Sequence, residues 1–61
     1  MTVAEFVRYL HKYGIRFKEH GKRHDVYWNT NNGAEVQISR HQSQEIKTGT
    51  KEQILKDLGL K

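Results

Sequence analysis

The stretch that shapes the rest of the chain runs from Ile15 to Trp28 and reads IRFKEHGKRHDVYW. Its first part, Ile15–His20, alternates apolar and polar residues, which is typical of a β-strand with one buried face. Its last part, His24–Trp28, is rich in aromatic and β-branched residues and also favours a strand. Because Gly21-Lys22-Arg23 separates the two parts, we predict an antiparallel hairpin with a basic tip.

The alternation predicts which side of the first strand is buried. Ile15 and Phe17 are expected to face the core, while Arg16, Lys18 and His20 share the open face. His20 is therefore predicted to lie among cations.

The second strand of the hairpin is compatible with two facings. Either His24, Val26 and Trp28 all face the core, or a bulge near the turn lets His24 point outward while Val26 stays inside. We favour an exposed or cleft-lining His24, with Asp25 on the opposite face of the strand from His24.

A helix is predicted before the hairpin. Thr2 followed by Glu5 is a capping-box pattern, and Gly14 supplies a left-handed stop. Between them the apolar residues follow helical spacing and form one stripe, made of Val3, Phe6, Val7, Leu10 and Tyr13. A helix of roughly 11 residues is too short to be stable alone, so this stripe must pack on the sheet.

A third strand and a second helix are predicted after the hairpin. The run Asn29-Thr30-Asn31-Asn32-Gly33 is a strong turn signal. It is followed by Ala34–Ser39, in which Ala34, Val36 and Ile38 are expected to face inward and Glu35 and Gln37 outward.

The polar segment Arg40–Glu45 reads as a loop that carries His41, and Ile46 is expected to pin this loop to the core. Thr50 with Gln53 repeats the capping-box pattern. The second helix then has an apolar stripe and ends at Gly59, the stripe being Ile54, Leu55 and Leu58.

The predicted order is helix, three strands, helix. This is an α+β fold, in which a three-stranded antiparallel sheet carries both helices on one face and leaves the other face open. That open face is expected to carry Arg16, Lys18, Glu35 and Gln37. With 61 residues and no linker or repeat, we expect residues 1–61 to form a single domain.

Composition narrows the function classes. Eleven Lys and Arg against seven Asp and Glu give a net charge of +4, which favours polyanionic partners. Five cations against the single anion Glu19 fall between Lys12 and Arg23. There is no cysteine, so a disulfide framework and a thiolate metal site are excluded. No segment approaches the roughly 20 apolar residues of a membrane span, so we expect a soluble, intracellular protein.

The tip of the hairpin is the candidate functional site. If the polyanionic partner is RNA and is cleaved here without a metal, the reaction needs a group that takes the proton from a ribose 2′-hydroxyl, and donors that stabilise the charge growing on the phosphate oxygens. A histidine such as His24 suits the first task, because an unperturbed imidazole titrates near pH ~6.5. Lys22 and Arg23 suit the second. From residue type alone, a basic hairpin with a polar surface histidine is the better explanation of these residues.

The remaining histidines and aromatic residues receive structural interpretations. His20 and His24 are spaced like a pair of metal ligands, but no cysteine or carboxylate cluster accompanies them, so we predict no metal and no cofactor. His11 is expected on the surface. Trp28 is assigned to packing or to a protein interface. The expected phosphate contacts are Lys22, Arg23, Lys18 and Arg16.

Three motifs, in this order and spacing, resemble the HicA toxin family of toxin–antitoxin pairs over nearly the whole chain. The family has a Gly-Ser-X-His motif after a first helix and strand, and here Gly21-Lys22-Arg23-His24 stands in its place. The family's Pro-X-His motif corresponds to Ser39-Arg40-His41. Its Glu-Ile-Lys segment corresponds to Glu45-Ile46-Lys47, and the helix that follows closes with Leu58-Gly59. Lys22 and Ser39 depart from the family pattern.

The resemblance implies a fold similar to the double-stranded-RNA-binding domain. It also implies a cytoplasmic bacterial or archaeal ribonuclease that cleaves mRNA, uses His24 as its essential histidine, and forms a hetero-oligomer with a HicB-type antitoxin. Gly21 would then take part in binding the phosphate, and His41 and His20 would be auxiliary residues. Two alternatives stay open, namely a non-catalytic double-stranded-RNA-binding module and a small module whose basic face binds an acidic protein.

Overall fold

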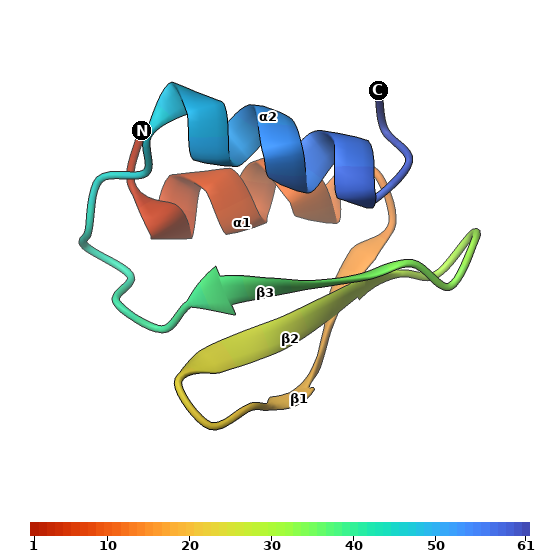
Figure 1. Cartoon of the computed structure of the whole chain (residues 1–61), viewed down its shortest axis with the longest axis horizontal. Helices are drawn as coiled ribbons and strands as arrows, with labels where there is room; N and C mark the ends of the chain where they lie inside the picture. Colours follow the sequence, from red (N-terminus) through yellow and green to blue (C-terminus); the bar gives the residue numbers. More distant parts are fainter.

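The computed structural model describes residues 1–61 and confirms the predicted order of elements. The elements are α1 (Val3–His11), β1 (Ile15–His20), β2 (His24–Asn29), β3 (Glu35–Ser39) and α2 (Thr48–Asp57). The strands form one antiparallel sheet in the order β1-β2-β3. Both helices lie side by side over the same face of this sheet (Figure 1). We call this the helix side, and the other the open face.

The capping box that begins α1 is present as predicted. The Glu5 amide donates to Thr2 Oγ1 over 3.3 Å, and the Thr2 amide donates to Glu5 Oε1 over 2.8 Å. The chain leaves the helix through Gly14, whose φ is +84°. Tyr13 is 48% exposed, so its prediction as part of the buried stripe is wrong. The reason is that α1 ends at His11, and the ring of Tyr13 packs against the exposed ring of Tyr9 at the surface.

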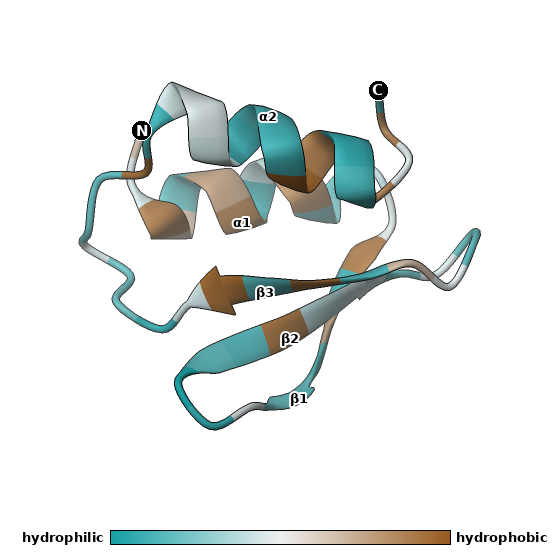
Figure 2. Ribbon diagram, viewed as in Figure 1, coloured by the Kyte–Doolittle hydropathy of each residue, from teal (hydrophilic) through white to brown (hydrophobic).

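The core lies between the two helices and the sheet. Figure 2 shows hydrophobic residues on both helices and alternating with polar ones along β3, as the sequence pattern predicts. The buried hydrophobic residues form one cluster: Val3, Phe6, Leu10, Ile15, Tyr27, Val36, Ile38, Ile54, Leu55 and Leu58. Ile46 packs against this cluster and pins the preceding loop, as expected.

The start of α2 differs from the prediction. The helix begins at Thr48, and its N-cap residue, Lys47, makes no side-chain capping bond, so the predicted box of Thr50 with Gln53 is wrong. The Ile46 amide already donates to the Met1 carbonyl, which fixes the chain just before Thr48 and allows the helix to start earlier. The buried stripe of α2 is confirmed, and Gly59 follows the helix with a φ of +77°.

A bulge in β1 changes the facing of His20. The register shifts between Phe17 and Glu19, which leaves Lys18 unpaired, and beyond this point His20 pairs with Asp25. Because one extra residue reverses the alternation of sides, His20 lies on the helix side with Asp25. The prediction that it shares the open face with Arg16 and Lys18 is wrong.

Phe17 is on the expected side of the sheet but is not buried. Its side chain is 47% exposed and touches the rings of Tyr27 and His20, with centroid distances of 5.8 Å and 5.0 Å. The expected burial fails because β1 runs away from the helices toward its His20 end (Figure 1).

The facing of β2 corrects both alternatives considered above. Asp25, Tyr27 and Asn29 are buried on the helix side, which places Val26 on the open face with His24. Both alternatives put Val26 inside. The buried side of β2 carries two polar residues, and these find partners, as when Asn29 Nδ2 donates to the Leu58 carbonyl over 2.8 Å. The favoured exposure of His24 is confirmed, as is the placement of Asp25 on the opposite face.

No helix in the structure has both the length and the apolar composition needed to cross a membrane.

Candidate functional site

The residues Gly21–His24, which we call the tip turn, join β1 to β2 at the end of the sheet that is farthest from the helices (Figure 1). The Gly21 amide donates to the His24 carbonyl over 2.8 Å, so Lys22 and Arg23 occupy the two central positions. Both side chains are exposed, and neither takes part in an ion pair. The tip turn therefore presents two uncompensated positive charges to solvent.

Glycine at position 21 has a steric reason. A Cβ atom on Gly21 would lie 2.6 Å from the His24 carbonyl oxygen, which is too close without a shift of the backbone. The main chain at Gly21 therefore lies close to the main chain at His24, where β2 begins. The Gly21 amide is used in this contact, so it is not free to bind a phosphate.

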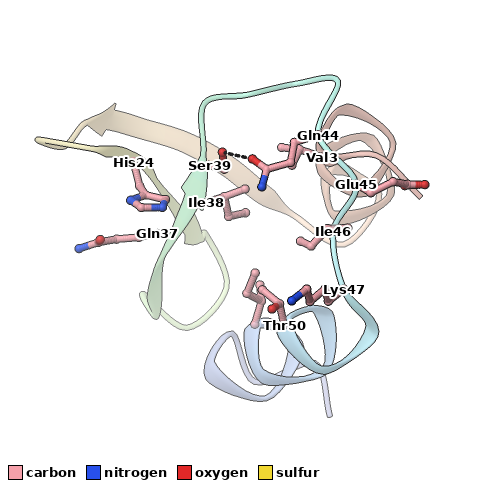
Figure 3. A pocket seen from close by; sticks show the side chains of 11 residues that line it. Val3, His24, Gln37, Ile38, Ser39, Gln44, Glu45, Ile46, Lys47 and Thr50 are labelled. Carbon is pink, nitrogen blue, oxygen red and sulfur yellow. Dashed lines mark hydrogen bonds between the residues drawn. The ribbon is translucent and has the colours of Figure 1, made fainter.

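His24 is exposed and lies at the rim of a cleft of 350 Å³. In Figure 3, the His24 and Gln37 side chains lie on one side of β3, while Gln44, Lys47 and Thr50 lie on the other. The cleft thus runs past the free edge of β3, from the open face to the start of α2. An extended ligand bound at His24 has room to continue around this edge.

The other two predicted phosphate contacts are engaged within the protein. Lys18 forms an ion pair with Glu35, and its ammonium lies 5.9 Å from the centre of the Trp28 ring. The hydrogen bond to Glu35 raises the pKa of Lys18. Arg16 Nη1 donates to the His11 carbonyl over 2.9 Å and to the Ile15 carbonyl over 3.2 Å. Only Lys22 and Arg23 among the four cations lack such partners.

Asp25 links the tip turn to the loop that follows β3. Its Oδ1 lies 2.8 Å from His20 Nδ1 and 2.9 Å from Arg40 Nε, and its side chain is 12% exposed. The hydrogen bond from His20 and then that from Arg40 lower the pKa of Asp25. Arg40 Nη2 also donates to the Gly21 carbonyl.

The two predicted auxiliary histidines, His20 and His41, lie in different parts of the structure. His20 and His24 lie on opposite faces of the sheet, so they do not converge on one ligand. His41 is exposed in the loop after β3, where its amide donates to Ser39 Oγ over 3.1 Å. His11 is exposed on α1 as predicted. No group of three or more side chains suited to holding a metal ion occurs.

Sequence reasoning missed Asp25 and Arg40. An acidic residue inside a β-prone run was one available signal, because such a residue is buried only when donors surround it. The donors came from His20 and Arg40, and neither contact is visible in the sequence, because one depends on the bulge and the other on the path of the loop.

A comparison with family models matches residues 3–60 to the HicA toxin of bacterial toxin–antitoxin systems. Comparisons with curated proteins and with solved structures give no match. The matched region contains both helices, the whole sheet, the tip turn and the loop that carries Arg40. This chain therefore belongs to the HicA toxin family of bacterial toxin–antitoxin systems.

Proposed function

We propose that this toxin is a ribonuclease that cleaves mRNA without a metal ion, with His24 as its single essential histidine. The observation that carries the proposal is the exposure of His24 beside two cations that have no ionic partner. An imidazole that is open to solvent can approach a ribose, and free cations next to it can approach the adjoining phosphate. Family membership supports the same function.

The reaction that suits these groups is attack by the neighbouring ribose 2′-oxygen on the phosphorus. His24 takes the 2′-hydroxyl proton, and the bond from phosphorus to the 5′-oxygen breaks as a solvent water protonates that oxygen. The products are a 2′,3′-cyclic phosphate and a 5′-hydroxyl. Lys22 and Arg23 stabilise the negative charge that grows on the phosphate oxygens. Lys18 and Arg16, which are already engaged, contribute to the field of the surface rather than to this phosphate.

The test is cleavage of a single-stranded RNA in the presence of EDTA, with wild type beside His24→Ala. General acid–base catalysis contributes about 10²- to 10⁴-fold, so the variant should lose that much activity. His11→Ala is the matched control, because it removes an exposed imidazole from α1, away from the tip turn. It should cleave RNA at the wild-type rate and give the same cyclic-phosphate ends.

Equal cleavage by wild type and His24→Ala would remove His24 from the mechanism. If wild type binds RNA but cleaves none, the protein is instead a non-catalytic RNA-binding module. A melting curve for each variant shows whether a loss of activity reflects unfolding, and His24 is exposed enough that its replacement should leave the curve unchanged.

The family also implies an antitoxin partner. We place a HicB-type antitoxin over the tip turn and the adjoining open face, where it would cover His24 and the partly exposed Trp28. Addition of the antitoxin should then stop cleavage, and it should shield Trp28 from a fluorescence quencher. Inhibition with no change in quenching of Trp28 would place the antitoxin elsewhere.

A further inference from the structure

Arg40 connects two parts of the molecule that are far apart in the sequence. It follows β3 and extends across the sheet to the β1–β2 hairpin, where Nε donates to Asp25 Oδ1 over 2.9 Å and Nη2 donates to the Gly21 carbonyl. One guanidinium thus binds both Gly21, the first residue of the tip turn, and Asp25, the residue that follows it. His24 lies between these two points of attachment.

The acceptor at one of these points is a buried carboxylate. Asp25 as a whole residue is 8% exposed, and a carboxylate removed from water needs donors to offset the loss of hydration. Arg40 supplies one donor, and His20 Nδ1, 2.8 Å away, supplies the other. Both donors bind the same oxygen, Oδ1. The carboxylate thereby orients the Arg40 guanidinium, whose Nη2 donates to the Gly21 carbonyl.

The tip turn does not hold itself in place. Two-residue hairpin loops favour turns with positive φ, because only these match the twist of the paired strands. In this chain positive φ is confined to Gly14, Gly33 and Gly59, so neither Lys22 nor Arg23 adopts it. The turn also has one closing main-chain bond, from the Gly21 amide to the His24 carbonyl, while the Gly21 carbonyl accepts from Arg40 instead.

We propose that Arg40 and Asp25 are positioning residues that hold the tip turn, and with it His24, in the geometry needed for cleavage. This inference rests on the ribonuclease function proposed above. The planar guanidinium is essential to it, because its fixed fork of donors can serve a carboxylate and a carbonyl at once. A lysine at position 40 would keep the charge but could not hold both acceptors in the same geometry.

The kinetic test compares Arg40→Ala, Arg40→Lys and Asp25→Asn with wild type on a short RNA. Misplacement of a catalytic group by about 1 Å costs up to about 100-fold, so kcat should fall by about 10- to 100-fold in all three variants, with a smaller change in KM. Arg8→Ala is the matched control for Arg40, because Arg8 is an exposed arginine on α1. Asp57→Asn, at the exposed end of α2, is the control for Asp25.

A second measurement does not depend on cleavage. Hydrogen exchange of the Gly21 amide, followed by NMR, reports directly on its bond to the His24 carbonyl. This exchange should be at least about tenfold faster in Arg40→Ala and Arg40→Lys than in wild type, because the turn opens more often. The Gly33 amide, which donates to the Asn29 carbonyl in the other turn, should exchange at the same rate in all variants.

Each outcome decides the proposal. Restoration of kcat by Arg40→Lys would show that Arg40 acts as a charge on the phosphate and would overturn the positioning role. Unchanged exchange at Gly21 would overturn it as well. If wild type cleaves no RNA, the ribonuclease function fails, and the exchange of Gly21 still decides whether Arg40 holds the turn.

Discussion

The two turns of the sheet are built in opposite ways. The turn from Asn29 to Ala34 is closed by its own residues, since the Asn29 amide donates to the Ala34 carbonyl and the Gly33 amide donates to the Asn29 carbonyl, both over 2.8 Å. Asparagine side chains add further bonds to the amides of Asn31 and Ala34. The tip turn has one main-chain bond, and its Gly21 carbonyl accepts a hydrogen bond from Arg40 in the loop after β3.

The surroundings of the two turns differ in the same sense. Asn29 and Asn32 both donate to the Leu58 carbonyl, which connects the turn from Asn29 to Ala34 to the end of α2. The tip turn lies away from the helices and presents Lys22 and Arg23 to solvent. The end of the sheet at the Asn29–Ala34 turn is thus fixed to the helices, while the end at the tip turn leaves its charged groups free for a ligand.

The largest expected effect on stability is at Asn29. Its side chain donates to the Leu58 carbonyl and accepts from the Asn31 amide, and the residue is 3% exposed. Loss of both bonds at a buried site should lower the free energy of unfolding by about 2–4 kcal/mol in Asn29→Ala, as measured by urea denaturation. Asn31→Ala, whose side chain makes no hydrogen bond, should cost less than about 0.5 kcal/mol. Equal losses would show that the turn is not held through Asn29.

The next effect concerns the tip turn and appears in RNA binding rather than in stability. If Lys22 and Arg23 each neutralise one phosphate, their joint replacement by alanine should reduce the salt slope of log affinity for single-stranded RNA by about 1.4. Replacement of Lys51 and Lys56, two cations of α2, is the matched control and should leave the slope unchanged. A slope that is the same in wild type and in the Lys22 and Arg23 double variant would contradict the phosphate role.

A smaller effect is expected at Gly33. Its φ is +79°, and no atom lies within 4 Å of the position that a Cβ would take. Gly33→Ala should therefore cost only the backbone penalty for the left-handed region, about 1–2 kcal/mol in thermal or urea unfolding. Gly33→Asn should recover part of it, because Asn tolerates this conformation. RNA cleavage by both variants should stay at the wild-type rate, and a loss of cleavage would show that the two turns are coupled.

The smallest effect is the acid dependence contributed by Asp25. The hydrogen bonds from His20 and Arg40 hold its pKa below the ordinary 3.8. A carboxyl with a lowered pKa in the folded state stabilises the fold above its unfolded value and loses this contribution as pH falls through the folded value. Wild type should therefore lose stability below about pH 4 more steeply than Asp25→Asn. Glu5 and Glu52 also have lowered pKa values and contribute equally in both proteins. If both proteins lose stability equally as the pH falls, the Asp25 carboxylate is not stabilised by its partners.

Periodicity predicted most of the fold. The stripe of α1, the alternation of β3 and the stripe of α2 all follow from apolar residues at fixed spacing, and except for Tyr13 at the end of the first stripe these faces pack into or against the core. The predictions failed where the buried residues are polar rather than hydrophobic. On β2 the buried side carries Asp25 and Asn29, whose polar groups are satisfied by residues distant in sequence, so a hydrophobic pattern alone assigns the wrong face.

The candidate site was predicted in part. The glycine, the two cations and the exposed His24 all follow from the sequence, since turn residues and charge are local properties of it. His20 was assigned to the wrong face, because a single bulged residue, Lys18, reverses every side chain that follows it in β1.

The sequence by itself determined the order of elements, the basic tip turn and the membership of a toxin family. Each of these depends on residues that are close together in the chain or on a pattern that repeats along it. Only the tertiary structure decided that Asp25 is buried, that Arg40 joins it to Gly21, and that Lys18 is engaged while Lys22 is free. Those contacts join residues 15 to 19 positions apart, and they exist only after the strands have paired and the loop after β3 has folded back.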